Sequence, residues 1–287
     1  MVQSLAQITR REILRRFLEE DIGRGDITTL ATVLPDQKAV GYFLAKAPLV
    51  LAGIELAIEV LALLDKDLMV ENRRRDGEYL REGDRAAGVR GQARALLTGE
   101  RVATNLLQQL SGIATLTKRF VDAVHGTNAR IVDTRKTTPG LRVFEKYAVT
   151  VGGGVNHRFG LDDAILIKDN HIKLVGGVRA AIEAARPAKD RTHRLEVEVT
   201  TLEELQEALR YDIDAVLLDN MKPDMVRTAV ALVRAHPSGR KIVVEASGRI
   251  TLENVRTFAE AGVDWISVGA LTHSAPAVDM SFKIQPV

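Results

Sequence analysis

The 287-residue sequence contains no cysteine. That absence excludes disulfide bonds, catalytic thiolates and zinc sites built from cysteine ligands. Aromatic residues make up only 4% of the chain, with a single tryptophan. Aliphatic side chains must therefore form most of the core, and a hydrophobic fraction of 46% is sufficient for one.

The chain also lacks long apolar runs and a strong charge of either sign. No stretch approaches the roughly 18 apolar residues of a membrane-spanning helix, and the N-terminal residues lack the apolar core of a signal peptide. With 40 basic and 38 acidic residues, the net charge is only +2. Nucleic-acid-binding domains usually carry a clear basic excess. We therefore expect a cytoplasmic protein that binds neither membranes nor nucleic acid.

The N-terminal part of the sequence predicts an antiparallel sheet with helices on one side. Helices are expected at 8–20 and 51–64, a strand at 40–45, and short strand-like pieces broken by glycine over 66–97. Residues 278–284 alternate between apolar and polar, which is typical of a half-buried antiparallel strand. We expect that last strand to return to the first domain.

A long helix from Gly99 to about His125, capped by Thr98, is expected to link two domains. Beyond it, strands and helices alternate. The expected strands are 129–133, 164–168, 194–199, 215–219, 241–246 and 265–268, with a further short one at 149–152, and the expected helices are 176–186, 201–210, 223–235 and 251–261. Such alternation predicts parallel pairing with right-handed crossovers, and six or seven units favour closure into a barrel over an open sheet.

The predicted fold class is therefore α/β, in two domains. Residues 1–110, together with 275–287, should form an α+β sandwich with an antiparallel sheet. Residues 111–274 should form a TIM-like parallel α/β barrel, which can be incomplete, and this domain should carry the active site.

Polar residues lie at the ends of the predicted parallel strands, where such folds keep their active sites. They are Asp133 and Arg135 after the first strand, Lys168 after the second, Glu196 and Glu198 in the third, Asp219 in the fourth and Glu245 in the fifth. Glu196 and Glu198 are two residues apart and project to the same face. Burying both inside a barrel would require cations or a metal to meet them.

Five cationic or potentially cationic residues lie near the first two strand ends: Arg135, Lys136, His157, Arg158 and Lys168. If the strand ends meet, these groups can converge on one pocket suited to a small ligand with several negative charges.

Small residues follow the last two parallel strands, at Ser247-Gly248 and at Gly269-Ala270. Such residues let backbone N–H groups approach a phosphate, and a helix starting near Thr251 would add its positive end. The pattern predicts a phosphate-binding site.

The motifs resemble those of a known family. DTRKTTPGLR, EKYAV, GGGVNHR, LIKDNHI, LEVEV, LLDNM, EASG and ISVGALTHS occur in the order found in quinolinate phosphoribosyltransferases, and EDIGRGDITT and TGERVATNLLQQLSGIAT also look like segments of that family. The resemblance spans residues 19 to 282. One departure is Arg249, where the family commonly has Gly or Asn after ASG, and it affects the local phosphate contacts.

The resemblance implies an enzyme of NAD biosynthesis that joins quinolinate to 5-phosphoribosyl-1-pyrophosphate (PRPP). The products would be nicotinate mononucleotide, pyrophosphate and carbon dioxide, with Mg²⁺ assisting. It also implies a homodimer in which Arg101 reaches the partner's active site. The resemblance implies that the substrates are bound by Arg101, Arg135, His157, Arg158 and Lys168. It implies catalytic roles for Lys136, Glu198 and Asp219, and direct or indirect Mg²⁺ ligation by Glu198 and Asp219. The phosphate-binding residues would be Ser247, Gly248, Gly269 and Ala270.

Three alternatives stay open at this stage. The first is a phosphoribosyltransferase for another pyridine acid such as nicotinate, although losing one carboxylate would make one arginine redundant. The second is a lyase that forms a Schiff base on Lys168, which would need a desolvated lysine. The third is a non-catalytic protein that binds phosphorylated ligands. The role of Lys146 is also open, between a helix-face partner of Glu145 and a distal site residue.

Overall fold

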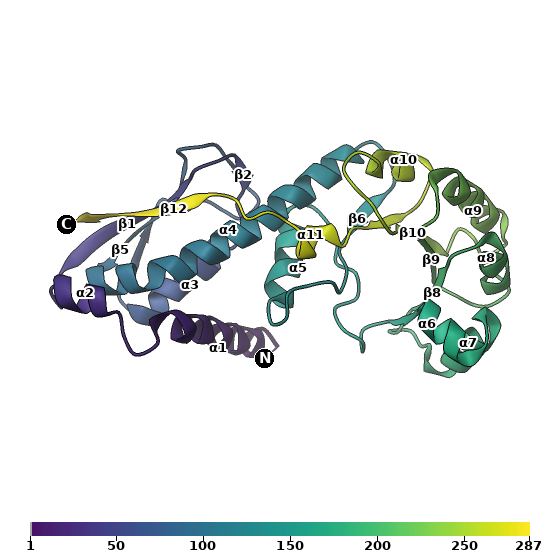
Figure 1. Ribbon diagram of the computed structural model, residues 1–287, viewed down its shortest axis with the longest axis horizontal. Helices are drawn as coiled ribbons and strands as arrows, with labels where there is room; N and C mark the ends of the chain where they lie inside the picture. The colour runs from purple at the N-terminus through teal and green to yellow at the C-terminus, as the bar shows by residue number, and fades with distance from the viewer. Residues whose placement is uncertain (1) are drawn as a thin grey trace. The chain divides into compact units, whose positions relative to one another are not determined.

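The computed structural model describes residues 2–287, with side chains from Arg10 onward (Figure 1). The chain divides into two compact units, residues 1–116 with 275–287 and residues 117–274. The predicted combination of an antiparallel N-terminal sheet and a TIM-like parallel α/β unit is confirmed. Among the described residues, none of the helices has both the length and the apolar character that a membrane span requires.

The first unit is built on a four-stranded antiparallel sheet in the order β12-β1-β5-β3. Its elements are α1 (Val2–Ile22), α2 (Ile27–Thr32), β1 (Lys38–Ala45), β2 (Leu49–Val50), α3 (Ile54–Leu64), β3 (Met69–Glu71), β4 (Tyr79–Leu80), β5 (Arg85–Gln92), the first part of α4 (Ala93–Ala123) and β12 (Met280–Pro286). As expected, the last strand returns to this sheet, where β12 pairs with β1. The rings of Phe43 and Phe282, paired in that register, lie 4.6 Å apart between centroids.

Hydrophobic periodicity accounts for these elements. Alternate residues of β1 are buried, and α3 buries Ile54, Leu56, Ala57, Val60 and Leu61 along one face. Gly41 is required in β1, because a Cβ there would lie 2.2 Å from the Phe282 ring. The N-terminal helix is longer than the expected 8–20, and buries Leu14 and Leu18.

The expected start of the linking helix is wrong. α4 begins at Ala93 rather than Gly99, so residues 93–97 are helical and Thr98 lies inside the helix. The Thr98 hydroxyl donates to Asp26 Oδ2 (3.1 Å) instead of capping. Strong helix formers in Ala-Arg-Ala-Leu-Leu extend the helix backward, and the Ala93 N–H is satisfied by Gln37 O (2.8 Å) without a side-chain cap.

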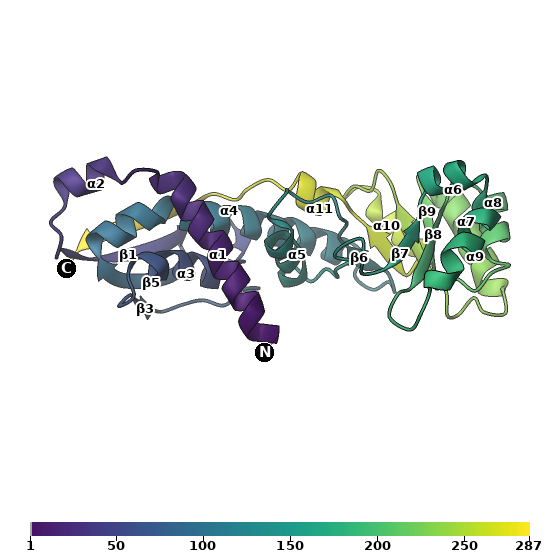
Figure 2. The same cartoon turned by 90° about the horizontal axis from the view of Figure 1, so that it is seen from below.

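The second unit contains a six-stranded parallel sheet in the order β6-β11-β10-β9-β8-β7. Its elements are β6 (Arg130–Val132), α5 (Arg142–Val151), β7 (Ile165–Ile167), α6 (Asp169–Val175), α7 (Val178–Ala185), η1 (Arg186–Ala188), β8 (Leu195–Val199), α8 (Leu202–Ala208), β9 (Ala215–Asp219), α9 (Pro223–Ala235), β10 (Val243–Ser247), α10 (Val255–Glu260), β11 (Trp265–Ser267) and α11 (Ala270–His273). All six main predicted strands are present. Helices α8, α9 and α10 lie along the outside of the curved sheet, and Figure 2 shows α6 to α9 grouped around β7, β8 and β9.

The expected closure of the barrel is not realised among the described strands. β6 and β7 are the two edges of the sheet and do not pair with each other. The strand expected at 149–152 is also wrong, because these residues end α5 and begin a glycine turn. Val149 is fully buried on the helix face, so packing overrides the β propensity of this valine-rich segment. The nearest substitute for a closing strand is a single bridge between Val132 and Val155.

Candidate active site

The strand ends of the second unit gather the predicted polar residues at one edge of the parallel sheet. Asp133 and Lys168 follow β6 and β7, while Glu196 and Glu198 lie in β8 and Asp219 ends β9. The registers place Glu198 opposite Leu217, and Ser247 opposite both Asp219 and Ser267. Because the strands are parallel, all of these ends face the same direction, which is the carboxyl edge of the sheet.

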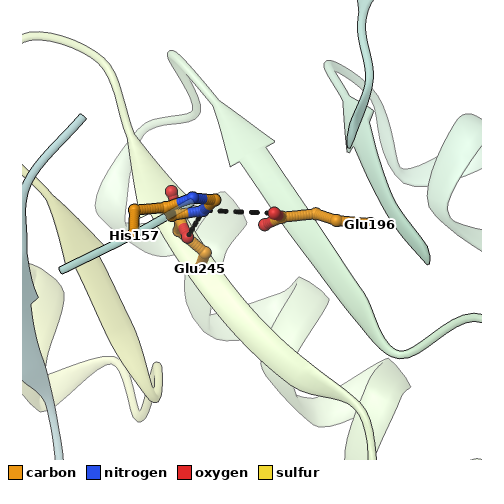
Figure 3. A group of neighbouring side chains, drawn as sticks. All are labelled: His157, Glu196 and Glu245. Carbon is orange, nitrogen blue, oxygen red and sulfur yellow. Dashed lines mark ion pairs between the residues drawn. The ribbon is translucent and has the colours of Figure 1, made fainter. Parts of the chain in front are cut away.

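A cluster of His157, Glu196 and Glu245 lies deeper along the strands, since Glu196 is opposite Ala215, the first residue of β9 (Figure 3). His157 Nε2 lies 3.2 Å from Glu196 Oε2 and 3.1 Å from Glu245 Oε2, and the glutamates come from β8 and β10. Glu196 is 5% exposed and Glu245 is 1% exposed. The edge of the Trp265 ring closes the cluster on another side. His157 is thus the group that meets the buried Glu196, and it is a cation when protonated.

Two influences on the His157 ring oppose each other. The Arg158 N–H donates to Nδ1 (2.8 Å), which requires that nitrogen to carry no proton. Burial lowers the pKa of His157, but hydrogen bonds and charge from Glu196 and Glu245 outweigh burial and raise it to about 10. The carboxylates dominate, because leaving two buried negative charges without a cation costs more than losing one backbone hydrogen bond. In the neutral tautomer that fits the Arg158 N–H bond, as in the imidazolium, Nε2 carries a proton and faces the two carboxylates.

The same three side chains have the donor types of a metal site, with ligand atoms within 4.8 Å of one another. A metal would require a bare Nε2, whereas the two carboxylates hold a proton there. Burial and the charge of Glu245 also raise the pKa of Glu196 to about 7. The cluster is therefore a proton-holding group under neutral conditions, distinct from the metal ligands predicted at Glu198 and Asp219.

A buried ion pair lies beside this cluster. Lys146 Nζ lies 2.5 Å from Asp133 Oδ1, and the two residues are 1% and 0% exposed. Burial raises the pKa of Asp133, while the hydrogen bond and charge of Lys146 lower it. Lys146 therefore has a buried partner in Asp133, thirteen residues before it in the sequence. Glu145 Oε2 accepts the Thr138 N–H (3.0 Å).

Arg135 and Arg158 lie close enough for their charges to interact. Burial, followed by the charge of Arg135, lowers the pKa of Arg158. Arg158 Nη1 donates to Ala164 O (3.1 Å), and Arg135 Nε is buried without a hydrogen-bond partner among the described side chains. Two neighbouring guanidinium groups with unused donors favour an anion between them.

Lys168 occupies a wetter position at the end of β7. Its ammonium lies 3.8 Å from Glu198 Oε2, and its side chain is 47% exposed. Burial raises the pKa of Glu198, and the negative charges of Asp219 and Asp169 act in the same direction. A lysine that forms a Schiff base must be shielded from water, and the exposed Lys168 is not.

Lys136 and the predicted phosphate segments lie at neighbouring strand ends. Gly269 packs against the Lys136 stem, since a Cβ on Gly269 would lie 3.1 Å from Lys136 Cδ. The Thr272 hydroxyl donates to Lys136 O (2.8 Å). This hydrogen bond joins the chain after β6 to α11, which begins at Ala270.

The segment after β10 has a strained geometry. Gly248 has φ +96°, and a Cβ there would lie 2.4 Å from Asn220 Oδ1. Arg249 has φ +53°, a left-handed conformation that favours Gly or Asn. The helix expected to start near Thr251 begins at Val255, because residues 251–254 form a turn in which Thr251 N–H donates to Asn254 Oδ1 (2.8 Å). The expected start of that helix is therefore wrong by four residues, and its contribution to phosphate binding stays a prediction.

The family resemblance implies that Arg101 acts in the partner's active site, and that expectation stays a prediction. Arg101 is an exposed residue of α4 in the first unit. Glu245 was noted only as a strand-end residue, and the Asp133–Lys146 pair was missed. A signal exists for Glu245, because it is an isolated carboxylate in the middle of an aliphatic strand, opposite Leu217 of β9.

Two family models match this chain. The N-terminal domain of quinolinate phosphoribosyl transferase matches residues 26–111, and its C-terminal domain matches residues 113–283. A probable nicotinate-nucleotide pyrophosphorylase (carboxylating) of Bacillus subtilis is 43% identical over 274 residues, covering 96% of this chain and 93% of that protein. The corresponding enzyme of Mycobacterium leprae is 44% identical over 280 residues, covering 96% of each.

Solved structures agree with the sequence comparisons. The crystal structure of NadC from Streptococcus pyogenes matches with a TM-score of 0.91 at 40% identity, covering 96% of each chain. The nicotinate-nucleotide pyrophosphorylase of Francisella tularensis matches with a TM-score of 0.89 at 38% identity, also covering 96% of each. With both domain models matched in order and relatives above 40% identity over nearly the whole length, this chain belongs to the quinolinate phosphoribosyltransferase family.

Proposed function

We propose that this protein transfers the phosphoribosyl group of PRPP to the ring nitrogen of quinolinate and releases one carboxylate as carbon dioxide. The observation that carries the proposal is the match to both domains of the family over residues 26–111 and 113–283. The chemistry of the carboxyl edge agrees with it, because cationic and acidic side chains gather there in the numbers that two anionic substrates and a cationic transition state require.

The cationic groups suit the quinolinate dianion. Arg135 and Arg158 can each fork onto a carboxylate, and the buried Arg135 Nε supplies a donor that awaits an acceptor. The exposed Lys168 adds a further positive group, whereas any charge on His157 is balanced by Glu196 and Glu245. A pyridine acid with a single carboxylate would leave part of this set unpaired, which favours quinolinate over nicotinate.

The acidic groups suit the ribose of PRPP. As pyrophosphate leaves, positive charge develops on the ribose ring, and Glu198 and Asp219 would stabilise that charge or hold the ribose hydroxyls. Lys136 would neutralise the departing pyrophosphate. Backbone N–H groups of Ser247, Gly248, Gly269 and Ala270 would bind phosphate.

The acidic pair also fits Mg²⁺, which prefers hard oxygen ligands. Burial together with the nearby charge of Asp219 raises the pKa of Glu198, so a local excess of negative charge exists that a divalent cation would relieve. Glu198 and Asp219 would hold the ion directly or through water. The ion would neutralise charge on the pyrophosphate as it departs.

The bond changes balance without a redox cofactor. The ring nitrogen forms a bond to the ribose carbon that carries pyrophosphate. At the same time, the bond from that carbon to the pyrophosphate oxygen breaks. The bond to the adjacent carboxylate then breaks, and its electron pair remains on the carbon next to the cationic nitrogen. One proton taken up at that carbon gives nicotinate mononucleotide.

The proposal is tested by incubating the purified protein with quinolinate, PRPP and Mg²⁺ and following pyrophosphate and carbon dioxide together. We expect equal amounts of both products, and no carbon dioxide when PRPP is withheld. Nicotinate in place of quinolinate should give pyrophosphate slowly or not at all. Absence of turnover with quinolinate, or inactivation by borohydride through Lys168, would reject the proposal.

We also propose a homodimer in which Arg101 acts in the partner's active site, as the family resemblance implies. Inactive Arg101→Ala and inactive Lys136→Ala chains are mixed and allowed to exchange subunits. A mixed two-fold dimer has one site with both lesions and one with neither, so about a quarter of all sites should be intact after complete exchange. No recovered activity despite verified exchange would exclude the contribution in trans.

A further inference from the structure

The buried Asp133–Lys146 ion pair has no part in the chemistry proposed above. Asp133 follows β6 and Lys146 lies on α5, and neither exposes more than 1% of its surface. Side chains that are fully buried cannot contact a ligand directly. The function of the pair must therefore be sought in what it contacts.

Both polar groups of the His157 backbone end on this pair. The His157 N–H donates to Asp133 Oδ1 (2.8 Å), and Lys146 Nζ donates to His157 O (3.0 Å). In the orientation that satisfies both of its amide atoms, Asn156 also donates to Asp133 Oδ2 (2.6 Å) and to Lys146 O (2.9 Å). Residues 156–158 lie outside any helix or strand. The ion pair therefore replaces the ladder of hydrogen bonds that would otherwise fix this backbone.

Stability alone does not explain an ion pair in this place. Removing two charges from water costs several kcal/mol per ion, so an apolar pair of similar volume is often as stable or more stable. An apolar pair could not, however, hold the N–H and the C=O of one residue in a fixed position. The distinguishing property of Asp133 and Lys146 is that they present an acceptor and a donor to the same residue.

We propose that the Asp133–Lys146 pair positions His157, and through it Arg158, for binding quinolinate. The inference rests on the proposed function, because it assigns the two residues a role in that reaction's substrate binding. Neither residue touches substrate in this account. They fix the backbone from which the His157 ring reaches Glu196 and Glu245, and from which the adjacent Arg158 extends.

The test uses Lys146→Met, which removes the charge and both donated hydrogen bonds, and Asp133→Asn, which keeps an oxygen for the His157 N–H.

The control is Arg234→Met. Arg234 pairs with Asp264 (2.6 Å) and donates to Gly239 O and Ile242 O, so it is also an ion pair that holds backbone. It lies at the amino ends of β10 and β11, the edge of the sheet opposite the proposed site. Loss of stability is measured for each variant by urea unfolding, and kinetics are compared where each is folded.

We expect Lys146→Met to raise KM for quinolinate at least about tenfold, while KM for PRPP changes by less than about threefold. Asp133→Asn should act in the same direction with a smaller effect. Arg234→Met should leave both KM values near those of the wild type, even if it costs similar stability. Unchanged quinolinate KM in Lys146→Met or Asp133→Asn, or an equal rise for both substrates, would overturn the proposal.

A second readout does not depend on turnover. The titration midpoint of the His157 ring, followed by NMR, should fall by at least about one pH unit in Lys146→Met, because a displaced ring loses its contact with the two glutamates. Loss of the Lys146 charge would by itself raise the midpoint, so an unchanged or raised midpoint in that variant refutes the role. If the wild type fails to turn over quinolinate, the proposed function fails, while this midpoint still tests the positioning role. If Lys146→Met does not fold, the quinolinate KM of Asp133→Asn decides.

Discussion

The His157 cluster predicts how the stability of the fold depends on pH. Its folded pKa is about 10, against 6.5 for an unperturbed histidine. The ring therefore stabilises the folded state fully below about pH 6.5, and that contribution is lost as pH rises toward 10. Within this window the folded protein binds one more proton than the unfolded chain, so the free energy of unfolding should fall by up to about 1.4 kcal/mol per pH unit.

The assay compares wild-type protein with His157→Gln by urea unfolding at several values between about pH 7 and pH 9. The raised pKa of Glu196, about 7, lies at the lower end of this range, and it depends in part on His157. Groups remote from the cluster titrate equally in both proteins, so the difference between their free energies of unfolding reports the titration of the cluster. His125→Gln, at an exposed position, is the control and should follow the wild type.

The difference should change steadily with pH, with the advantage of the wild type decreasing as pH rises. Parallel curves for wild type and His157→Gln would refute the reasoning. That result would mean that the ring is neutral at pH 7, with the Arg158 N–H bond to Nδ1 deciding the tautomer and the proton shared among the carboxylates instead.

The remaining predictions concern single substitutions. Arg135→Ala and Arg158→Ala should each weaken quinolinate use, measured as kcat/KM, by about 2–5 kcal/mol, because a dianion loses a charge-assisted pair; near wild-type kinetics in Arg158→Ala would contradict the assignment. Glu198→Ala and Asp219→Ala should lower kcat more than they raise KM, since ribose charge develops mainly in the transition state; a pure KM effect in both would indicate ground-state ribose binding. Arg249→Gly should raise the free energy of unfolding by up to about 1 kcal/mol by relieving the φ of +53°, and a loss of stability in urea unfolding would contradict the strain.

The sequence predicts the parallel strands well, and for a physical reason. Each is a short aliphatic run that ends in charged residues, such as Leu195–Val199 and Ala215–Asp219. Burial on both faces demands such a run, and the charges mark the edge where the strand meets solvent or ligand. The helix expected over 201–210 is also present as α8, where the Thr201 hydroxyl caps the helix by accepting the Glu204 N–H (3.2 Å).

The errors arise where contacts distant in sequence decide the local structure. Residues 149–152 have strand propensity, but burial of Val149 on α5 makes them helical. The start of α4 depends on Gln37, which accepts the Ala93 N–H from across the unit. The partnership of Lys146 with Asp133 spans thirteen residues and two elements, so the local sequence around Lys146 does not predict it.

Glu196 and Glu198 show what sequence spacing can and cannot predict about a strand. Their spacing correctly predicts two carboxylates on one face, yet two residues along a strand are separated by about 6.6 Å. Glu196 meets His157, whose side chain is 10% exposed, whereas Glu198 meets Lys168, whose side chain is 47% exposed. The inner carboxylate is thus already committed to a buried proton, and the outer one retains a loose partner that a ligand could displace. That difference in depth, which sequence spacing does not encode, is why we assign ribose and Mg²⁺ contacts to Glu198 rather than to Glu196.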